Sequence, residues 1–214
     1  MNATVKVEHA DKAFGSFQAL SDVSLEAPQG EITGLVGNNG SGKTVLLKCI
    51  VGLMYLTGGQ ITVFDKVIGK DAEFAPDTGF IIEHPGFLPS MNGFQNLKYL
   101  ARLSGRASDA DIRTAIERVG LDPKSRKCVA KYSMGMKQRL GIAQAIMEKP
   151  KLLIFDEPLN GLDVAAIDDM RALFREMADE GMTIIIASHN RDDIALLCHR
   201  VYQMNVGRLS LIDA

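Results

Sequence analysis

A glycine-rich segment near the start of the chain has the spacing G-x-x-x-x-G-K-[ST], which is typical of phosphate-binding loops. The segment and the residue after it are Gly37, Asn38, Asn39, Gly40, Ser41, Gly42, Lys43, Thr44 and Val45. Glycines let successive backbone N–H groups turn toward an anion, and a helix starting near Gly42 would add its positive end. Lys43 would then reach the β- and γ-phosphates, and the Thr44 hydroxyl would bind Mg²⁺. The pattern predicts a nucleotide site, and a glycine-rich turn that binds nothing is the weaker interpretation.

Two acidic residues follow a second apolar segment. Residues 152–155 are Leu-Leu-Ile-Phe, and Asp156 and Glu157 come directly after them. In a doubly wound sheet, a strand ending there would bring Asp156 close to the phosphate loop. We expect Asp156 to hold Mg²⁺ with Thr44, and Glu157 to accept a proton from the water that attacks the γ-phosphate. A solvated acidic turn is the alternative, and the phosphate loop makes it the weaker one.

The elements that must position these residues predict an α/β fold. Apolar segments at 32–36, 79–83, 152–155 and 183–187 are expected to be buried strands of a mainly parallel sheet, with helices between them. Before them, apolar and polar residues alternate around Val5 and Val23, which predicts an antiparallel β subdomain.

Helical spacing and glycines predict where the helices lie. Apolar residues recur at helical spacing from 91 to 147, which predicts an inserted helical subdomain over about 84–147, with Ser108 and Asp111 forming a capping box. The α/β core would then comprise 1–83 and 148–214. Gly58-Gly59 is expected to end the first helix. The last helix is expected to carry Ile194, Leu197, Cys198 and Val201, before a hairpin of residues 201–205 and 208–212 around Gly207.

Composition limits the partners and the compartment. The 214 residues suit a single domain, and 24 Lys and Arg against 26 Asp and Glu give a net charge of −2, so no nucleic-acid partner is expected. Three distant cysteines suggest neither a disulfide framework nor a metal cluster, which fits a reducing cytosol. The first residues lack the apolar core of a signal peptide, and no apolar segment reaches the ~18 residues that span a bilayer. We therefore expect a cytoplasmic chain that reaches the membrane only through another protein.

The segment at 132–139 distinguishes among phosphate-loop proteins. Its sequence is Tyr-Ser-Met-Gly-Met-Lys-Gln-Arg, and it lies about twenty residues before Asp156. It resembles the Leu-Ser-Gly-Gly-Gln signature of the ATP-binding subunits of ABC transporters, matching at Ser133 and Gly135, while Met134 and Met136 replace a glycine and a glutamine. The resemblance implies a P-loop NTPase fold of the ABC ATPase type and covers nearly the whole chain.

The resemblance also implies roles for single residues. Asp163 lies in the segment that touches the opposite subunit, and His189 is similar to the switch histidine that senses the γ-phosphate. Phe14 lies where the family stacks an aromatic ring on adenine, with Phe17 as the weaker candidate. Glu83 stands where the family most often has a Gln that reaches Mg²⁺ and the attacking water. A carboxylate at this position could bind the metal directly, but it would also bring negative charge close to the γ-phosphate.

Function and partners follow from the same resemblance. Two such subunits, expected to be identical, would close head to tail, with ATP between the phosphate loop of one and Ser133, Gly135 and Met136 of the other. A transmembrane permease would hold the pair on the inner face of the cell membrane. The segments 82–89 and 133–139 look most like those of ATPases of bacterial exporters that give self-protection against bacitracin and lantibiotics.

Three other interpretations remain open at this stage. A soluble ABC-type ATPase acting on a ribosome or DNA would usually carry two ATPase units, coiled-coil insertions or basic extensions, and none is visible in this sequence. A regulatory module that holds ATP without turnover would not need Glu157 and His189. A phosphate-loop kinase or GTPase would leave the segment 132–139 without an explanation.

Overall fold

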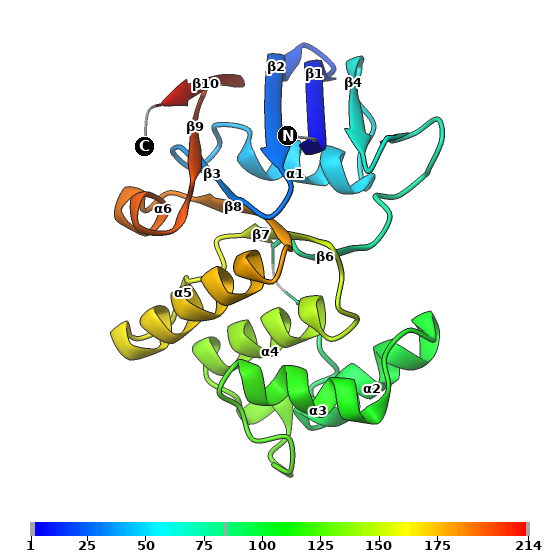
Figure 1. Cartoon of the computed structure of the whole chain (residues 1–214), viewed down its shortest axis with the longest axis vertical. Helices are drawn as coiled ribbons and strands as arrows, with labels where there is room; N and C mark the ends of the chain where they lie inside the picture. Colours follow the sequence, from blue (N-terminus) through cyan, green and yellow to red (C-terminus); the bar gives the residue numbers. More distant parts are fainter. Residues whose placement is uncertain (1–2, 84, 213–214) are drawn as a thin grey trace.

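The computed structural model describes residues 3–83 and 85–212 and contains two sheets. A four-stranded antiparallel sheet has the order β2-β1-β4-β5, and a six-stranded sheet has the order β10-β9-β3-β8-β7-β6. Figure 1 shows the antiparallel sheet at one end of the molecule, the six-stranded sheet in the middle and a group of helices at the other end. Helix α1 lies between the two sheets. The predicted α/β fold with a mainly parallel central sheet is confirmed.

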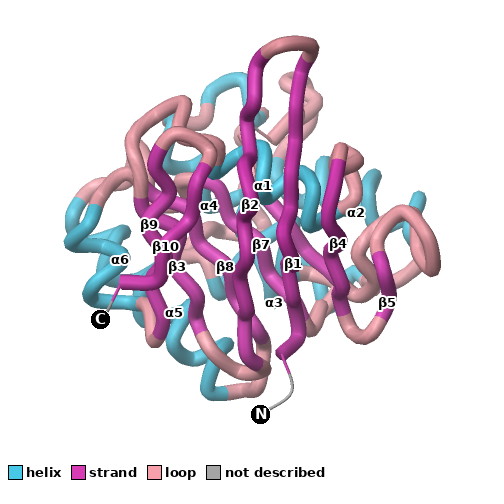
Figure 2. The backbone as a smooth tube through the Cα atoms, turned by 90° about the horizontal axis from the view of Figure 1, so that it is seen from above, coloured by secondary structure: helices cyan, strands magenta, loops and turns pink. Residues whose placement is uncertain are grey.

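The central sheet is formed by β3 (Ile32–Val36), β6 (Thr78–Ile81), β7 (Leu152–Asp156), β8 (Thr183–Ser188), β9 (Arg200–Asn205) and β10 (Arg208–Ile212). The other sheet is formed by β1 (Ala3–Phe14), β2 (Phe17–Pro28), β4 (Gly58–Val63) and β5 (Lys66–Val67). The helices are α1 (Lys43–Val51), α2 (Gly93–Ser104), α3 (Asp109–Arg118), α4 (Met134–Ile146), α5 (Val164–Asp179) and α6 (Arg191–Leu197), with a 3₁₀ turn at Val129–Lys131. Seen from above, β1 and β2 pass over the strands of the central sheet (Figure 2).

The central strands are apolar throughout because both faces of their sheet are covered. Along β7, Leu152 and Ile154 pack into the core that contains α1, while Leu153 and Phe155 pack into the core that contains α4 and α5. Phe155 is fully buried and stacks on Phe174 of α5, with ring centroids 5.1 Å apart. Burying each large side chain contributes about 1.5–3 kcal/mol. This packing fixes the end of β7, where Asp156 and Glu157 emerge.

Two predicted helix ends are wrong. Helix α1 ends at Val51, followed by Gly52 at φ 87°, and a Cβ at Gly52 would lie 2.3 Å from the Glu73 carbonyl oxygen. Gly58 and Gly59 instead begin β4. Helix α6 ends at Leu197, and Val201 lies in β9, where it pairs with Gly34 and Ile212. The apolar spacing continues across both breaks, so periodicity alone did not reveal them.

Helices α2, α3 and α4 lie between β6 and β7 in the chain, and we call them the helical insert. Arg118 of α3 connects the insert to α5, with its Nη2 atom 3.2 Å from Glu176 Oε1. The predicted capping box of α3 is confirmed: the Asp111 N–H donates to Ser108 Oγ at 3.2 Å, and the Ser108 N–H donates to Asp111 Oδ2 at 3.0 Å. Within the described residues, no helix combines the length and apolar character needed to span a membrane.

Replacing Ser108 by alanine is expected to lower the free energy of unfolding by about 1 kcal/mol, because the first turn of α3 loses its cap. Urea denaturation followed by circular dichroism would measure the change. Ser210→Ala, at an exposed serine of β10, is the matched control and should leave the midpoint unchanged. Equal midpoints for the two variants would contradict a stabilising role of the Ser108 cap.

Candidate functional site

The glycine-rich loop connects β3 to α1, and its lysine is buried. Lys43 is 5% exposed, and its Nζ atom donates to the Gly37 carbonyl at 2.6 Å and to the Asn38 carbonyl at 3.3 Å. Among the described residues, Lys43 forms no ion pair with an acidic side chain. A buried ammonium without a counter-charge is costly, so the loop fits an anionic ligand at this point. The positive end of α1 favours the same ligand.

The C-terminal hairpin holds the loop from behind. A Cβ at Gly37 would lie 2.3 Å from the Met204 carbonyl oxygen of β9, so only glycine allows this close approach. The Gly207 N–H, between β9 and β10, donates to the Ser41 carbonyl at 2.9 Å. Gly37 therefore serves packing, and the loop is held by an element far along the chain.

Thr44 and Asp156 meet as the sequence predicts. The Thr44 hydroxyl at the start of α1 donates to Asp156 Oδ2 at the end of β7, over 2.6 Å. Asp156 is 8% exposed, and this burial raises the pKa of its carboxyl, as does the neighbouring charge of Glu157 to a smaller extent. A hydroxyl and a carboxylate are oxygen ligands that suit Mg²⁺, and a divalent cation would offset the buried negative charge. Thr44 and Asp156 are therefore the residues that would hold the metal.

Glu157 is held in an unusual backbone conformation. Its φ of 52° lies in the left-handed region, which costs a residue with a side chain about 1–2 kcal/mol. Its N–H donates to the Ala187 carbonyl at 2.8 Å, which ties it to β8. Its carboxylate accepts the His189 N–H at 2.9 Å and the Ser188 hydroxyl at 3.2 Å, and Oε1 lies 2.9 Å from His189 Nδ1. The fold thus brings the predicted base and the predicted switch histidine into direct contact.

A cavity of about 440 Å³ contains most of these residues. Its lining comprises Phe17, Ala19, Asn39, Gly40, Ser41, Gly42, Lys43, Thr44, Val45, Asp156 and Glu157. The aromatic ring in this lining is Phe17, which is 63% exposed. Phe14 is 46% exposed, and the Lys12 ammonium lies 5.0 Å from its ring centroid, outside the lining. The adenine-stacking role of Phe14 stays a prediction, and the geometry brings Phe17 closer to the loop.

The signature segment lines a different cavity. Ser133 is the N-cap of α4, where its hydroxyl oxygen accepts the Met136 N–H at 3.1 Å, and Asp163 caps α5 in the same way through Ala166. Ser133, Gly135 and Asp163 line one cavity together, and it shares no lining residue with the cavity of Lys43. The Met136 side chain packs against the hydrophobic core. Within one chain, the predicted ATP-binding residues therefore form two separate groups.

Glu83 follows β6 and lies outside the lining of the Lys43 cavity. Its side chain is 63% exposed, its φ is 65°, and its Oε1 atom lies 2.6 Å from Lys48 Nζ of α1. Its negative charge contributes to the raised pKa of Asp156, as the last of several causes. A role of Glu83 in metal binding stays a prediction, and the next residue, His84, lies outside the described residues.

Sequence reasoning missed two contacts to Glu157. The Ser188 hydroxyl binds its carboxylate, and the Gln138 side-chain amide donates to its backbone carbonyl at 3.2 Å. A signal for Gln138 exists in the sequence, because this polar residue lies on the same face of α4 as apolar residues of the core, among them Ile142. Spacing alone does not say which atom such a buried amide would bind.

Comparisons with known proteins agree with this geometry. A family model described as ABC transporter matches residues 20–160. The chain is 42% identical to an uncharacterized ABC transporter ATP-binding protein of Bacillus subtilis, YybJ, over 96% of this chain and 94% of that protein. It is 38% identical to the bacitracin transport ATP-binding protein BcrA of Enterococcus faecalis, over 98% of this chain and 68% of that protein.

A solved structure shows the same fold. It is cbiO1 of Clostridium perfringens, described as part of the ABC transporter complex cbiONQ, with a TM-score of 0.84 and 28% identity over 99% of this chain and 88% of that chain. These similarities do not favour a soluble ATPase that acts on ribosomes or DNA. The family model, the relatives above 30% identity and the arrangement of Lys43, Asp156 and Glu157 lead to one conclusion: the chain belongs to the ABC transporter ATP-binding family and is an ATPase of that family.

Proposed function

We propose that two copies of this chain close head to tail around ATP, hydrolyse it with Glu157 as general base, and thereby drive a permease that exports a peptide antibiotic. The observation that carries the proposal is the position of the Glu157 carboxylate. It lines the Lys43 cavity beside Asp156, and the His189 and Ser188 side chains hold it there. This is the arrangement that a base acting on a γ-phosphate requires.

Each residue of the site has a distinct task in this mechanism. Lys43 exchanges its carbonyl partners for phosphate oxygens, and the loop N–H groups bind the rest of the triphosphate. Thr44 and Asp156 would hold Mg²⁺, which would neutralise charge on the phosphates. Glu157 takes a proton from the attacking water, while His189 orients the carboxylate. The Ser133 hydroxyl and Gly135 N–H of the second copy complete the shell around the γ-phosphate.

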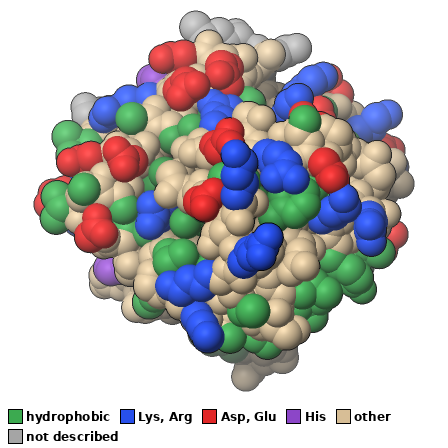
Figure 3. Space-filling view, turned by 90° about the horizontal axis from the view of Figure 1, so that it is seen from below, with side chains coloured by type: hydrophobic (Ala, Val, Ile, Leu, Met, Phe, Trp, Pro, Cys, Tyr) green, Lys and Arg blue, Asp and Glu red, His purple; other side chains and the backbone are tan. Residues whose placement is uncertain are grey.

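Charge distribution supports a homodimer. Residues 84–147 carry 11 Lys and Arg against 4 Asp and Glu, whereas the remaining residues carry 13 against 22. The stretch 124–139, which contains the signature segment, has six basic residues and no acidic one. Figure 3 shows several Lys and Arg side chains on the face seen from below, where the helical insert lies, with Asp and Glu side chains between some of them. A chain with a basic insert and an acidic core is complementary to a second copy in the head-to-tail orientation.

Salt is therefore expected to weaken the ATP-bound dimer. Raising KCl from about 50 mM to about 500 mM shortens the screening length by about threefold, which weakens attraction between exposed charges. Light scattering of the Glu157→Gln variant at saturating ATP would show more monomer at high salt. Lys137→Glu, at an exposed position of the basic stretch, should also increase the monomer fraction at low salt. Lys151→Glu, at an exposed position outside the helical insert, should not. A dimer fraction insensitive to both salt and Lys137→Glu would contradict electrostatic complementarity.

The permease and the substrate extend the proposal to the membrane. Phe80 and Leu88, on either side of Glu83 in the chain, are 39% and 41% exposed, and a membrane partner could cover these apolar side chains. Through that partner the dimer would lie on the inner face of the membrane. The 38% identity to BcrA supports a bacitracin-like peptide as the substrate.

Drug susceptibility tests this proposal in cells. In a strain without the gene for this chain, growth is expected to stop at lower concentrations of bacitracin or a lantibiotic than in the parent strain. The wild-type gene should restore resistance, and the Glu157→Gln gene should not. Unchanged resistance to both peptide classes in the deletion strain would overturn the substrate assignment, even if the purified chain hydrolyses ATP.

A further inference from the structure

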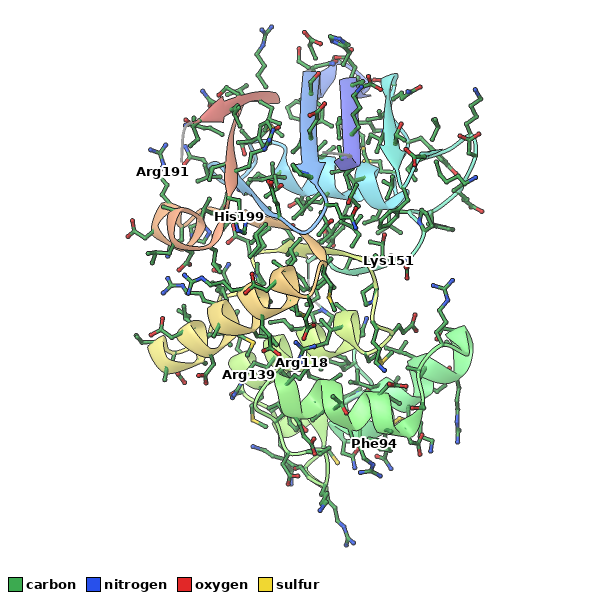
Figure 4. The ribbon with its side chains drawn as sticks, viewed as in Figure 1. Phe94, Arg118, Arg139, Lys151, Arg191 and His199 are labelled. Carbon is green, nitrogen blue, oxygen red and sulfur yellow. The ribbon has the colours of Figure 1, made fainter. Side chains whose placement is uncertain are left out.

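The buried side-chain amide of Gln138 connects the helical insert to the backbone of Glu157. Gln138 lies in the second turn of α4, five residues after Ser133, and is 8% exposed. Its Nε2 atom donates to the Glu157 carbonyl oxygen at 3.2 Å. The next residue behaves differently, because Arg139 Nη1 donates to the Gly120 carbonyl within the insert. Figure 4 labels Arg139 and also Arg118, which pairs with Glu176 of α5.

The bond acts on a residue whose direction depends on its backbone. Glu157 has a φ of 52°, and its N–H is tied to the Ala187 carbonyl of β8. Gln138 holds the carbonyl at the other side of the same residue, so α4 and β8 fix Glu157 between them. Rotation of this backbone would swing the carboxylate away from the His189 N–H and Nδ1 atoms that it contacts at 2.9 Å. The hydrogen bond from the Gln138 amide therefore restricts the orientation of the Glu157 carboxylate.

We propose that Gln138 is a positioning residue that sets the orientation of the Glu157 carboxylate for hydrolysis, an inference that rests on the proposed role of Glu157 as base. Helix α4 is continuous from Met134 to Ile146, and Ser133 caps its first turn. A shift of that turn moves Gln138 with it. When the ATP of a second copy contacts Ser133 and Gly135, any resulting shift of α4 would change the orientation of Glu157 through the Gln138 hydrogen bond.

The test uses a nearly isosteric variant that lacks the amide. Gln138→Met is expected to lower kcat about tenfold, because a small misplacement of a catalytic group costs rate, while KM for ATP stays within about twofold. The matched control is Gln144→Met on the same helix, whose side-chain amide makes no hydrogen bond among the described residues. It should leave both constants unchanged. Equal kcat values for the two variants would overturn the inference.

A double-mutant cycle separates positioning from general destabilisation. If Gln138 acts through Glu157, then Gln138→Met should lower the residual single-turnover rate of Glu157→Gln by less than about twofold. A further tenfold loss in that background would overturn the inference and leave the role of Glu157 intact. Near-normal turnover of Glu157→Gln alone would instead overturn the proposed function, so the two failures are distinguishable.

A second variant covers the case in which methionine disturbs folding. Gln138→Glu keeps the size, and its carboxyl can donate to the Glu157 carbonyl only when protonated. Burial and the nearby Glu157 charge should raise the pKa of the introduced carboxyl. Its kcat, relative to that of the wild type at the same pH, is expected to rise as the pH falls from about 8 to about 6. A flat ratio would overturn the inference.

Discussion

Replacing Glu157 by glutamine is expected to leave ATP binding unchanged and to lower hydrolysis by a hundredfold or more, the loss typical of a removed general base. Glutamine has the same size and can still contact His189, but it does not accept a proton from water. Lys43, Thr44 and Asp156 stay in place, so ATP should bind with its normal affinity. Equilibrium binding of ATP and a single-turnover assay would measure the two quantities separately.

The same variant should accumulate as an ATP-bound dimer, because ATP that is not hydrolysed keeps the two copies together. Glu180→Gln, at the surface acid that caps the far end of α5, is the control and should hydrolyse ATP at the normal rate. Turnover of Glu157→Gln within a few-fold of the wild type would remove Glu157 from the role of base.

Mixing two inactive variants is expected to restore activity. Lys43→Ala removes the phosphate contact of one copy, and Ser133→Arg fills the signature surface that faces the other copy. In a mixed dimer, one site combines the intact loop of the Ser133→Arg chain with the intact signature of the Lys43→Ala chain. The other site contains both defects. Random mixing of equal amounts makes half of the dimers mixed, each with one intact site, so about a quarter of the wild-type activity should return if sites act independently.

The wild-type chain diluted with an inert protein provides the reference for this assay, and ATP hydrolysis per total chain is the measured quantity. When each variant is measured alone, Ser133→Arg should bind ATP with normal affinity and Lys43→Ala should bind it weakly. No gain in activity over either variant alone, at concentrations where dimers form, would contradict a site shared between two chains.

Local pattern together with strand order was enough to predict the parts of the site that lie at the carboxyl ends of the parallel strands. The loop from Gly37 to Thr44 has its own spacing, and β7 is a continuous apolar strand, so the meeting of Thr44 with Asp156 followed from the topology of a parallel sheet. The contact between Glu157 and His189 also arises at neighbouring strand ends, β7 and β8. The strand order of α/β folds therefore explains why these contacts at the strand ends could be predicted.

Contacts that do not follow from strand order were not predictable in the same way. The loop packs against the hairpin at Met204 and Gly207, and the Gln138 amide reaches Glu157 from the helical insert. Apolar periodicity continued past Leu197 into Val201, although the chain had already changed from helix to strand. Phe17 lines the cavity and Phe14 does not, although the two residues pair directly across the β1–β2 hairpin.

Site-directed cross-linking tests most directly whether a second copy of the chain completes the ATP site. Asn39→Cys places a thiol in the exposed phosphate loop, and Met134→Cys places one beside the signature, where Met134 is 59% exposed. Burial raises the pKa of Cys49 to about 11 and that of Cys198 to about 12, so Cys128→Ser leaves no reactive background thiol. A mixture of the two variants, in the Glu157→Gln background with ATP and a short bifunctional thiol reagent, should give a cross-linked dimer. Either variant alone, or the mixture without ATP, should stay monomeric, and a dimer band that is independent of ATP or of mixing would contradict the account.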